Sequence, residues 1–241
     1  MRVNRIALAG NPNTGKSTLF NTLTGLKQHT GNWPGKTVVH AEGSFEHNGE
    51  QYILVDLPGT YSLFSNSADE EVARDYIIFD QPDATIVVLD ATSLERNLNL
   101  ALQVLEMTNN VIICINLIDE AEKKGIRIDE KRLARELGVP VVKISARNKK
   151  GINRLLDTLS QLVKGQIVTT PYRMKYSKEI EEAITKVELK LEGYFDEKYP
   201  SRWIALRLLD GDEELILKLQ NHKNNKQHEV RTNGVPVSVK S

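Results

Sequence analysis

Apolar residues in the N-terminal part of the chain occur either in continuous runs or at helical spacing. Continuous runs predict strands that are buried on both faces, as in a parallel sheet. They occupy Val3–Ala9, Thr85–Asp90, Val111–Asn116 and Val141–Ser145. Apolar residues that recur every three or four positions predict amphipathic helices between these strands. The helices cover residues 17–24, 67–79, 94–107, 129–138 and 152–162.

Capping residues mark several of these helix ends. Ser67 and Glu70 have the spacing of a capping box, and Asp129 is a suitable N-cap. Gly25 and Gly138 follow the last apolar residue of their helices, where a left-handed residue ends the helix. The helix boundaries are therefore predicted by local chemistry as well as by periodicity.

One pair of strands differs from the others, because Asn48-Gly49 is the strongest short signal for a hairpin turn. The flanking segments Val38–His47 and Gln51–Asp56 are predicted to pair antiparallel. Gln28–Lys36 and Leu57–Asn66 are rich in turn residues and are predicted loops. The alternation of strands and helices predicts an α/β fold with a doubly wound, mixed but mostly parallel sheet. Ligands of such sheets bind at the carboxyl ends of the strands.

The pattern changes after a linker between Gly165 and Pro171. Apolar residues at helical spacing predict helices over residues 180–191, Trp203–Leu209 and Glu213–Leu219, and a polar tail begins at about residue 222. We expect two domains, residues 1–166 and a small all-helical domain at 172–241. The second carries no dense polar group, which favours a structural or interaction role.

Charge and cysteine content narrow the function classes. The 32 Lys and Arg residues balance 32 Asp and Glu residues, so no bulk positive field favours nucleic acid, and we expect no nucleic-acid partner. The single cysteine, Cys114, excludes an intramolecular disulfide and indicates a reducing compartment. We see no signal peptide and no apolar run of membrane-spanning length, and we expect a soluble, cytosolic chain.

The strongest chemical signal follows the first predicted strand. It is the phosphate-loop pattern G-x-x-x-x-G-K-[ST], formed by Gly10, Asn11, Pro12, Asn13, Thr14, Gly15, Lys16 and Ser17. The glycines allow close backbone approach, and amides of the loop and of the helix start, up to Thr18, can bind a polyphosphate. Lys16 is predicted to bind the β- and γ-phosphates and Ser17 to ligate magnesium. The pattern predicts a nucleotide site.

Two further segments supply groups for magnesium and for the γ-phosphate. Asp56-Leu57-Pro58-Gly59 fits D-x-x-G, in which the carboxylate reaches magnesium through water and the Gly59 amide approaches the γ-phosphate. Thr37 ends the first loop and is a candidate magnesium ligand that would swing in when a triphosphate binds.

Two motifs at strand ends predict which base is bound. Asn116, Leu117, Ile118 and Asp119 match N-K-x-D except that Leu117 replaces the lysine. Asp119 can accept hydrogen bonds from guanine N1–H and the exocyclic N2 amine, a donor pair that adenine lacks. Ser145, Ala146 and Arg147 match the S-A-K/R loop whose amides contact the guanine carbonyl. We expect GTP and GDP as ligands, with modest affinity because Leu117 supplies no charge.

Taken together, these motifs resemble those of translation-factor-type P-loop GTPases. The chain is more closely similar to the cytosolic N-terminal G domain and helical domain of the FeoB family of ferrous-iron transporters. The stretches that carry this resemblance are GNPNTGKSTLFN (10–21), GNWPGKTV (31–38), DLPGTYSL (56–63), NLIDEA (116–121), SAR (145–147) and RWIALRLLDGD (202–212).

The resemblance implies a GTPase with a slow intrinsic rate that regulates or drives ferrous-iron uptake at the cytoplasmic face of a bacterial or archaeal membrane. It implies activation by potassium, with Asn13 as a ligand and Gly31 and Trp33 carbonyls completing the shell. It adds Gly35 to the nucleotide-contacting residues. The candidate catalytic residues are Asn13, Lys16, Thr37 and Gly59. A membrane permease domain is expected C-terminal in the full-length protein, and the oligomeric state stays open.

Two alternatives remain. A cytosolic GTPase of RNA modification or ribosome assembly would share G-x-P-N-x-G-K-S. A GTP-binding module without hydrolysis is favoured by Leu117 and by Thr60, which stands where many GTPases carry a water-orienting glutamine. No Cys/His cluster in the sequence marks an iron site, so the link to iron rests on the resemblance.

Overall fold

A computed structural model describes residues 3–25, 28–64, 67–195, 199–212, 214–215 and 217–221. The chain divides into two compact units, residues 1–174 and residues 175–241. The first unit holds the sheet and is called the nucleotide unit below. The second is called the helical unit. Each is described by itself.

The nucleotide unit is built on one seven-stranded sheet of order β2-β3-β4-β1-β5-β6-β7. The strands are β1 (Asn4–Gly10), β2 (Gln28–Asn32), β3 (Val39–His47), β4 (Glu50–Asp56), β5 (Ala84–Asp90), β6 (Val111–Asn116) and β7 (Val141–Lys143). β1 pairs in parallel with β4 and β5, and β5, β6 and β7 continue the parallel part. β3 pairs antiparallel with both β2 and β4. The predicted mixed, mostly parallel sheet is confirmed.

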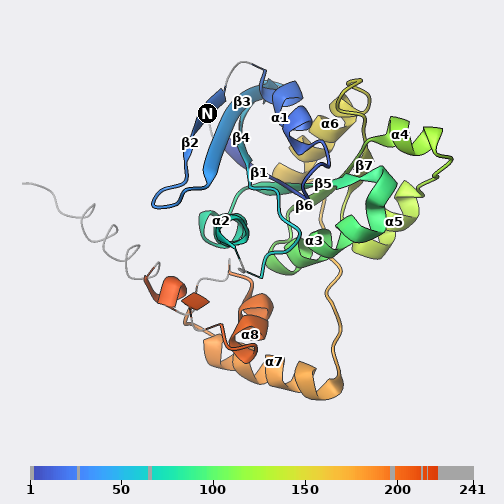
Figure 1. Ribbon diagram of the computed structural model, residues 1–241. Helices are drawn as coiled ribbons and strands as arrows, with labels where there is room; N and C mark the ends of the chain where they lie inside the picture. The colour runs from blue at the N-terminus through green and yellow to red at the C-terminus, as the bar shows by residue number, and fades with distance from the viewer. Residues whose placement is uncertain are drawn as a thin grey trace, which may run out of the picture. The chain divides into compact units, whose positions relative to one another are not determined.

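Helices cover both faces of this sheet (Figure 1). They are α1 (Lys16–Thr24), α2 (Ala68–Asp75), α3 (Leu94–Met107), α4 (Ile118–Lys123), α5 (Glu130–Leu137) and α6 (Ile152–Val163), with a π-helical turn η1 (Tyr76–Asp80) and a 3₁₀ turn η2 (Ala91–Ser93). Helices α1 and α6 lie on one side of the sheet, and α2, α3 and α5 lie on the other (Figure 1). On the first side, side chains of α1 and α6 pack on buried residues of β1, β5 and β6, such as Leu8, Ile86 and Cys114. Burial raises the pKa of the Cys114 thiol, which stays protonated within this core.

Local signals placed the turns and caps correctly. Asn48 and Gly49 both have positive φ (51° and 76°), as the predicted hairpin turn requires. The Ser67 hydroxyl accepts a hydrogen bond from the Glu70 amide at 3.2 Å, and Asp129 caps α5 in the same way. The predicted extents of α3 and β6 agree with the structure.

The prediction of a loop at Gln28–Lys36 was wrong in its first half, because Gln28–Asn32 forms strand β2. This edge strand pairs with Val39–Gly43 of β3. Its glycine and polar residues carry no strand pattern, and the pairing with β3 is what orders it. The helix from Ser67 to Phe79 ends as the π-helical turn η1, and β7 is shorter than predicted, with Ser145 forming a single bridge to Lys150. The short helix α4 was not predicted.

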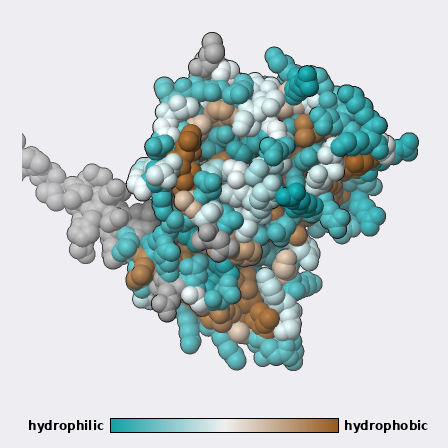
Figure 2. Space-filling view, in the orientation of Figure 1, coloured by the Kyte–Doolittle hydropathy of each residue, from teal (hydrophilic) through white to brown (hydrophobic). Residues whose placement is uncertain are grey.

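The helical unit contains α7 (Lys178–Leu191) and α8 (Ser201–Leu209), which pack on each other. Both helices were predicted. Ile184, Trp203 and Ile204 are buried, whereas Ile180 is 43% exposed. Of the third predicted helix, residues 214–215 and 217–219 are helical, and Glu213 and Ile216 lie outside the described residues, as does the polar tail from His222. Hydrophobic patches remain on the surface of this unit (Figure 2).

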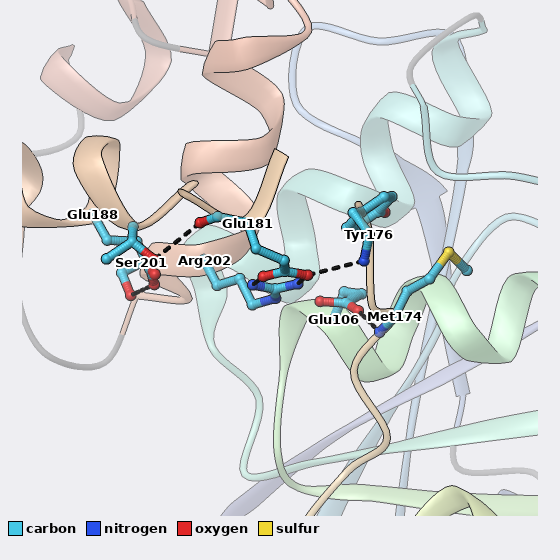
Figure 3. A network of polar contacts seen from close by, with 8 residues as sticks. Glu106, Met174, Tyr176, Glu181, Glu188, Ser201 and Arg202 are labelled. Atoms are coloured by element: carbon cyan, nitrogen blue, oxygen red, sulfur yellow. Dashed lines mark hydrogen bonds and ion pairs between the residues drawn. The ribbon is translucent and has the colours of Figure 1, made fainter. Parts of the chain in front are cut away.

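A polar network fixes the start of the helical unit (Figure 3). Arg202 donates two hydrogen bonds to the Glu181 carboxylate, each at 2.8 Å, and Glu181 also accepts from the Tyr176 amide at 2.9 Å. The Ser201 hydroxyl donates to Glu188 at 2.8 Å. The network joins α7, α8 and the segment before α7. Within the described residues, no helix has the length and apolar character needed to cross a membrane.

Candidate functional site

The loops that carry the predicted nucleotide motifs lie at one edge of the sheet, where the parallel strands end (Figure 1). The register pairs Leu8 with Asp56 and Asp90 with Asn116, which aligns the carboxyl ends of β1, β4, β5 and β6. Segments far apart in the sequence therefore meet at this edge. The predicted location of the site at the strand ends is consistent with this arrangement.

The phosphate loop is tightly packed at its two fixed glycines. A Cβ on Gly10 would lie 2.7 Å from the carbonyl oxygen of Val88, and one on Gly15 would lie 2.4 Å from Asn116 Nδ2. Gly15 also has φ of 78°, a left-handed conformation that favours glycine. The Thr14 hydroxyl donates to the Asn11 carbonyl at 3.0 Å and closes the turn. The loop is held in one conformation immediately before α1.

Lys16 is a buried, positively charged residue at the ends of the parallel strands. Its ammonium donates to Asp56 Oδ1 at 2.5 Å and to the Leu57 carbonyl at 2.7 Å. Only 10% of the Lys16 side chain and 15% of the Asp56 side chain are exposed. Burial raises the pKa of the Asp56 carboxyl, while the Lys16 charge and hydrogen bond act against that rise. The geometry joins the phosphate loop directly to the D-x-x-G segment.

The D-x-x-G segment lies against the phosphate loop at a second point. The Thr60 amide donates to the Gly10 carbonyl at 3.3 Å, and Thr60 is 5% exposed. A Cβ on Gly59 would lie 3.5 Å from backbone atoms of Pro12. Gly59 thus sits at the phosphate loop, as expected for a residue whose amide approaches a phosphate.

Asn116 connects the phosphate loop to the S-A-R segment. Its Nδ2 donates to the Thr14 carbonyl and its Oδ1 accepts from the Ala146 amide, both at 3.0 Å. Asn116 is 1% exposed. Asn116 and the Ala146 amide were both predicted to read guanine, and here they bind each other. The side-chain Nδ2 of Asn116 has a second N–H group, which can contact a ligand.

Asp119 lies beside the S-A-R segment. Its Oδ2 accepts a hydrogen bond from Asn148 Nδ2 at 3.0 Å, and Asn148 Nδ2 also donates to Ser145 Oγ at 3.0 Å. The nearby Ser145 hydroxyl is the main cause that lowers the pKa of the Asp119 carboxyl, and Asn148 adds to it. The carboxyl is therefore ionised, as recognition of a guanine edge requires.

Sequence reasoning missed Asn148, because no motif covers it; its position three residues after Ser145 was the available signal. Leu117, the departure from N-K-x-D, adopts φ of 60° and is the N-cap residue of α4. Its side chain lies close to the phosphate loop, since a Cβ on Gly15 would be 3.9 Å from Leu117 Cδ2. Leu117 thus provides an apolar surface where the lysine stem lies in the usual motif. Ile118 is buried and Arg147 is exposed.

The segment from Gly31 to Val38 is more exposed than the phosphate loop. Gly35 and Thr37 are exposed, and the Trp33 amide and carbonyl bond to Val38 and Lys36. The Trp33 ring packs edge-on against His40 and Tyr76, with centroids 4.5 and 5.4 Å apart. Trp33 is therefore a packed aromatic of this segment.

The exposed groups of the phosphate loop are Asn13, Ser17 and Thr18. No group of three or more His, Cys, Asp or Glu residues suited to a metal occurs in the described part of the chain. A hydroxyl from Ser17 and a carboxylate from Asp56 are hard oxygen donors, which fit a magnesium ion that keeps several waters and binds phosphate.

Comparison with known proteins gave consistent matches over both units. A family model described as ferrous iron transport protein B matches residues 4–159, and one described as FeoB cytosolic helical domain matches residues 176–233. A Fe(2+) transporter FeoB of Methanocaldococcus jannaschii is 46% identical over 224 residues, which are 92% of this chain and 33% of that protein. A Fe(2+) transport protein A/Fe(2+) transporter FeoB fusion protein of Porphyromonas gingivalis is 41% identical over 215 residues, which are 88% of this chain and 26% of that protein.

Solved structures agree. The cytosolic domain of the T. maritima FeoB iron transporter in a GDP form has a TM-score of 0.83 and 38% identity, covering 98% of this chain and 87% of that chain. A GMPPNP form of the same domain has a TM-score of 0.81 and 37% identity, covering 98% and 88%. The chain spans about a quarter to a third of the length of the curated relatives.

Proposed function

The chain belongs to the ferrous iron transport protein B family, and we propose that it is the part of such a protein that binds and hydrolyses GTP. Its nucleotide unit is a G domain of that family, and its helical unit matches the family's helical domain. The observation that carries the proposal is the buried Lys16 ammonium, held between a phosphate loop and the D-x-x-G carboxylate. The cytosolic domain of T. maritima FeoB, with the same fold, has GDP and GMPPNP forms.

Lys16 and Asp56 bind each other here, and each would take a new partner when a nucleotide binds. When the loop amides bind a polyphosphate, the Lys16 ammonium would bind the β- and γ-phosphate oxygens. Asp56, released from Lys16, would then join Ser17 and Thr37 in holding magnesium, with Asp56 in the outer shell. The magnesium ion supplies charge that neutralises the phosphates. Because Asp56 is largely buried, a cation must stay near it in either arrangement.

The base end is supported by the Asp119 carboxylate, whose lowered pKa keeps it ionised. It would accept the N1–H and N2–H donors of guanine, while Leu117 supplies an apolar surface beside the phosphate loop. Asn116, Ala146 and Arg147 complete the segment around the base.

Hydrolysis would need charge stabilisation beyond this set. Thr60 is buried and its amide bonds to Gly10, so it is poorly suited to orient water as a glutamine does. Asn13 has an exposed side chain on a left-handed residue of the phosphate loop, which suits a ligand of potassium beside the phosphates. The Trp33 carbonyl already accepts a hydrogen bond from the Lys36 amide, and its second lone pair would bind the cation, together with the Gly31 carbonyl.

Steady-state GTP hydrolysis in magnesium buffer, compared in potassium and in sodium at equal ionic strength, tests this function. We expect multiple turnovers that are faster in potassium. Asn13→Ala should abolish the potassium advantage, and Asn153→Ala, an exposed asparagine on α6, should keep it. Equal rates in the two salts would refute the potassium site, and binding of GTP without turnover would refute hydrolysis.

The role in a whole protein is a further part of the proposal, since the relatives are three to four times longer than the matched region. We propose that GTP binding and hydrolysis regulate ferrous-iron uptake through a membrane permease part, with this chain at the cytoplasmic face. Asn13→Ala introduced into the full-length gene should lower uptake of radiolabelled ferrous iron by cells. Undiminished uptake, with hydrolysis impaired, would contradict the coupling.

A further inference from the structure

Asn148 makes two contacts at the base end of the site that the motifs do not account for. Its side-chain nitrogen lies 3.0 Å from Asp119 Oδ2 and 3.0 Å from Ser145 Oγ. The nitrogen is assigned to this side of the amide because an ionised carboxylate only accepts hydrogen bonds. Both N–H groups of the amide are therefore used, and they fix the amide between the acid and the serine.

The loop that presents Asn148 is closed at its base. The Ser145 amide donates to the Lys150 carbonyl at 3.0 Å, and the Lys150 amide donates back to Ser145 at 3.1 Å. Inside this closure the Lys149 amide donates to the Ala146 carbonyl at 3.2 Å, and Lys149 adopts φ of 54°. The backbone on either side of Asn148 is thus fixed by hydrogen bonds, so the side chain is presented to Asp119 from a defined position.

The two oxygens of Asp119 have different surroundings. Oδ2 accepts from Asn148, whereas Oδ1 is buried and accepts no hydrogen bond from the described residues. A buried carboxylate oxygen without a donor is costly, and a ligand that brings N–H donors would satisfy it. Guanine brings two such donors side by side, and each carboxylate oxygen has a further lone pair to accept one.

We propose that Asn148 is a positioning residue for guanine selectivity, an inference that rests on the proposed function of the site. It acts through Asp119: by holding Oδ2 it sets the rotation of the carboxylate, so that both oxygens meet the guanine edge together. Without Asn148 the carboxylate can rotate, and the two hydrogen bonds to the base are no longer made at once. The second of these bonds, to the exocyclic amine, is the one that separates guanine from hypoxanthine.

Removal of the Asn148 side chain could also have the opposite effect and strengthen nucleotide binding, so the direction of the change tests the proposal. If Asn148 only competed with the base for Asp119, its removal would strengthen nucleotide binding. If it positions Asp119, its removal weakens the preference for GDP over IDP, because IDP lacks the exocyclic amine and loses less.

Dissociation constants of the full chain for GDP and IDP, measured by calorimetry with magnesium, separate these cases. For Asn148→Ala we expect the GDP preference over IDP to fall by about tenfold, the scale of one well-placed hydrogen bond to a charged group. Asn148→Asp keeps the shape but replaces the donor with a second carboxylate beside Asp119, and should lose the preference as well. Lys150→Ala, in the same loop and bonded through its backbone, should keep it. Asp119→Asn gives the limit for loss of the carboxylate.

Each result has a definite meaning. An unchanged GDP to IDP ratio in Asn148→Ala, or tighter GDP binding, overturns the inference while GDP binding by the unmodified chain leaves the proposed function standing. Absence of GDP binding by the unmodified chain overturns both. Should Asn148→Ala fail to fold by circular dichroism, Asn148→Ser, which keeps a short polar side chain too small to reach both partners, serves with the same expected fall.

Discussion

Two ion pairs in this molecule each join a basic side chain to a carboxylate, but the pKa values of the two carboxyl groups are shifted in opposite directions. In the nucleotide unit, Lys16 and Asp56 are 2.5 Å apart, with 10% and 15% of their side chains exposed. In the helical unit, Arg202 and Glu181 are 2.8 Å apart, with 24% and 34% exposed (Figure 3). The pKa of Asp56 is raised, mainly by burial, whereas hydrogen bonds from Arg202 and the Tyr176 backbone lower the pKa of Glu181 to about 2.

The difference shows what each pair contributes. For Asp56, loss of solvation outweighs the attraction of Lys16, so the pair is a poor source of stability and its charges stay available for a ligand. For Glu181, water still solvates part of the carboxylate, and three hydrogen bonds favour its ionised form. The first pair lies in the proposed nucleotide site, and the second joins two helices and the segment before them.

The largest expected effect comes from removing the buried cation. Lys16→Met leaves the Asp56 carboxylate buried without its partner, which should destabilise the nucleotide unit by about 3 kcal/mol at neutral pH. It should also weaken GDP binding by roughly a hundredfold, because charge-assisted hydrogen bonds to phosphate are lost. Chemical denaturation and calorimetric titration measure the two losses separately.

A double variant shows whether the buried charge is the cause. Lys16→Met combined with Asp56→Asn removes both charges, so most of the stability should return while nucleotide binding stays weak. A double variant as unstable as Lys16→Met alone would mean that Asp56 is not the reason for the loss.

A smaller effect is expected on stability as a function of pH, to which Asp56 and Glu181 should contribute with opposite signs. The folded-state pKa of Asp56 lies above its ordinary value of 3.8, so ionisation of this group opposes folding as pH rises from 3.8 through the folded-state pKa. The folded-state pKa of Glu181 lies below its ordinary value of 4.5, so its stabilisation is present above 4.5 and is lost as pH falls toward about 2.

Calorimetric melting of three chains between pH 2 and pH 6 reads these slopes. Relative to the unmodified chain, the melting temperature of Asp56→Asn should rise with pH above 3.8. That of Glu181→Gln should fall with pH between about 2 and 4.5. Slopes of the same sign in the two variants would contradict the contrast between the pairs.

How far the sequence predicts this molecule depends on the range of the interactions. Strand runs such as Val111–Asn116 and caps such as Ser67 depend on near neighbours in the chain, and they were predicted correctly. Strand β2 was missed because pairing with β3, which no local pattern records, is what orders Gln28–Asn32.

The same limit applies to the site. Motif spacing predicted which residues gather at the strand ends, because each fixed position has a local reason. It gave no sign that Lys16 bonds Asp56 across 40 residues, or that Asn148 bonds Asp119 across 29. Such contacts depend on how the loops pack, so they required the three-dimensional structure. The roles of Thr37, Gly35 and Arg147 toward a nucleotide stay predictions.

The smallest effect is expected for an ion pair that is more exposed than either of the two compared above. Lys178 and Glu182 lie one helical turn apart on α7 with charged atoms 3.9 Å apart, and their side chains are 86% and 57% exposed. Water and salt screen such a pair, and ordering two long side chains offsets the remaining attraction. Lys178→Ala should therefore leave the melting temperature of the helical unit unchanged within error, at low and at high salt. A clear salt-dependent loss would show that exposure is not what separates Glu181 from an ordinary surface carboxylate, and would point instead to the number of its hydrogen bonds.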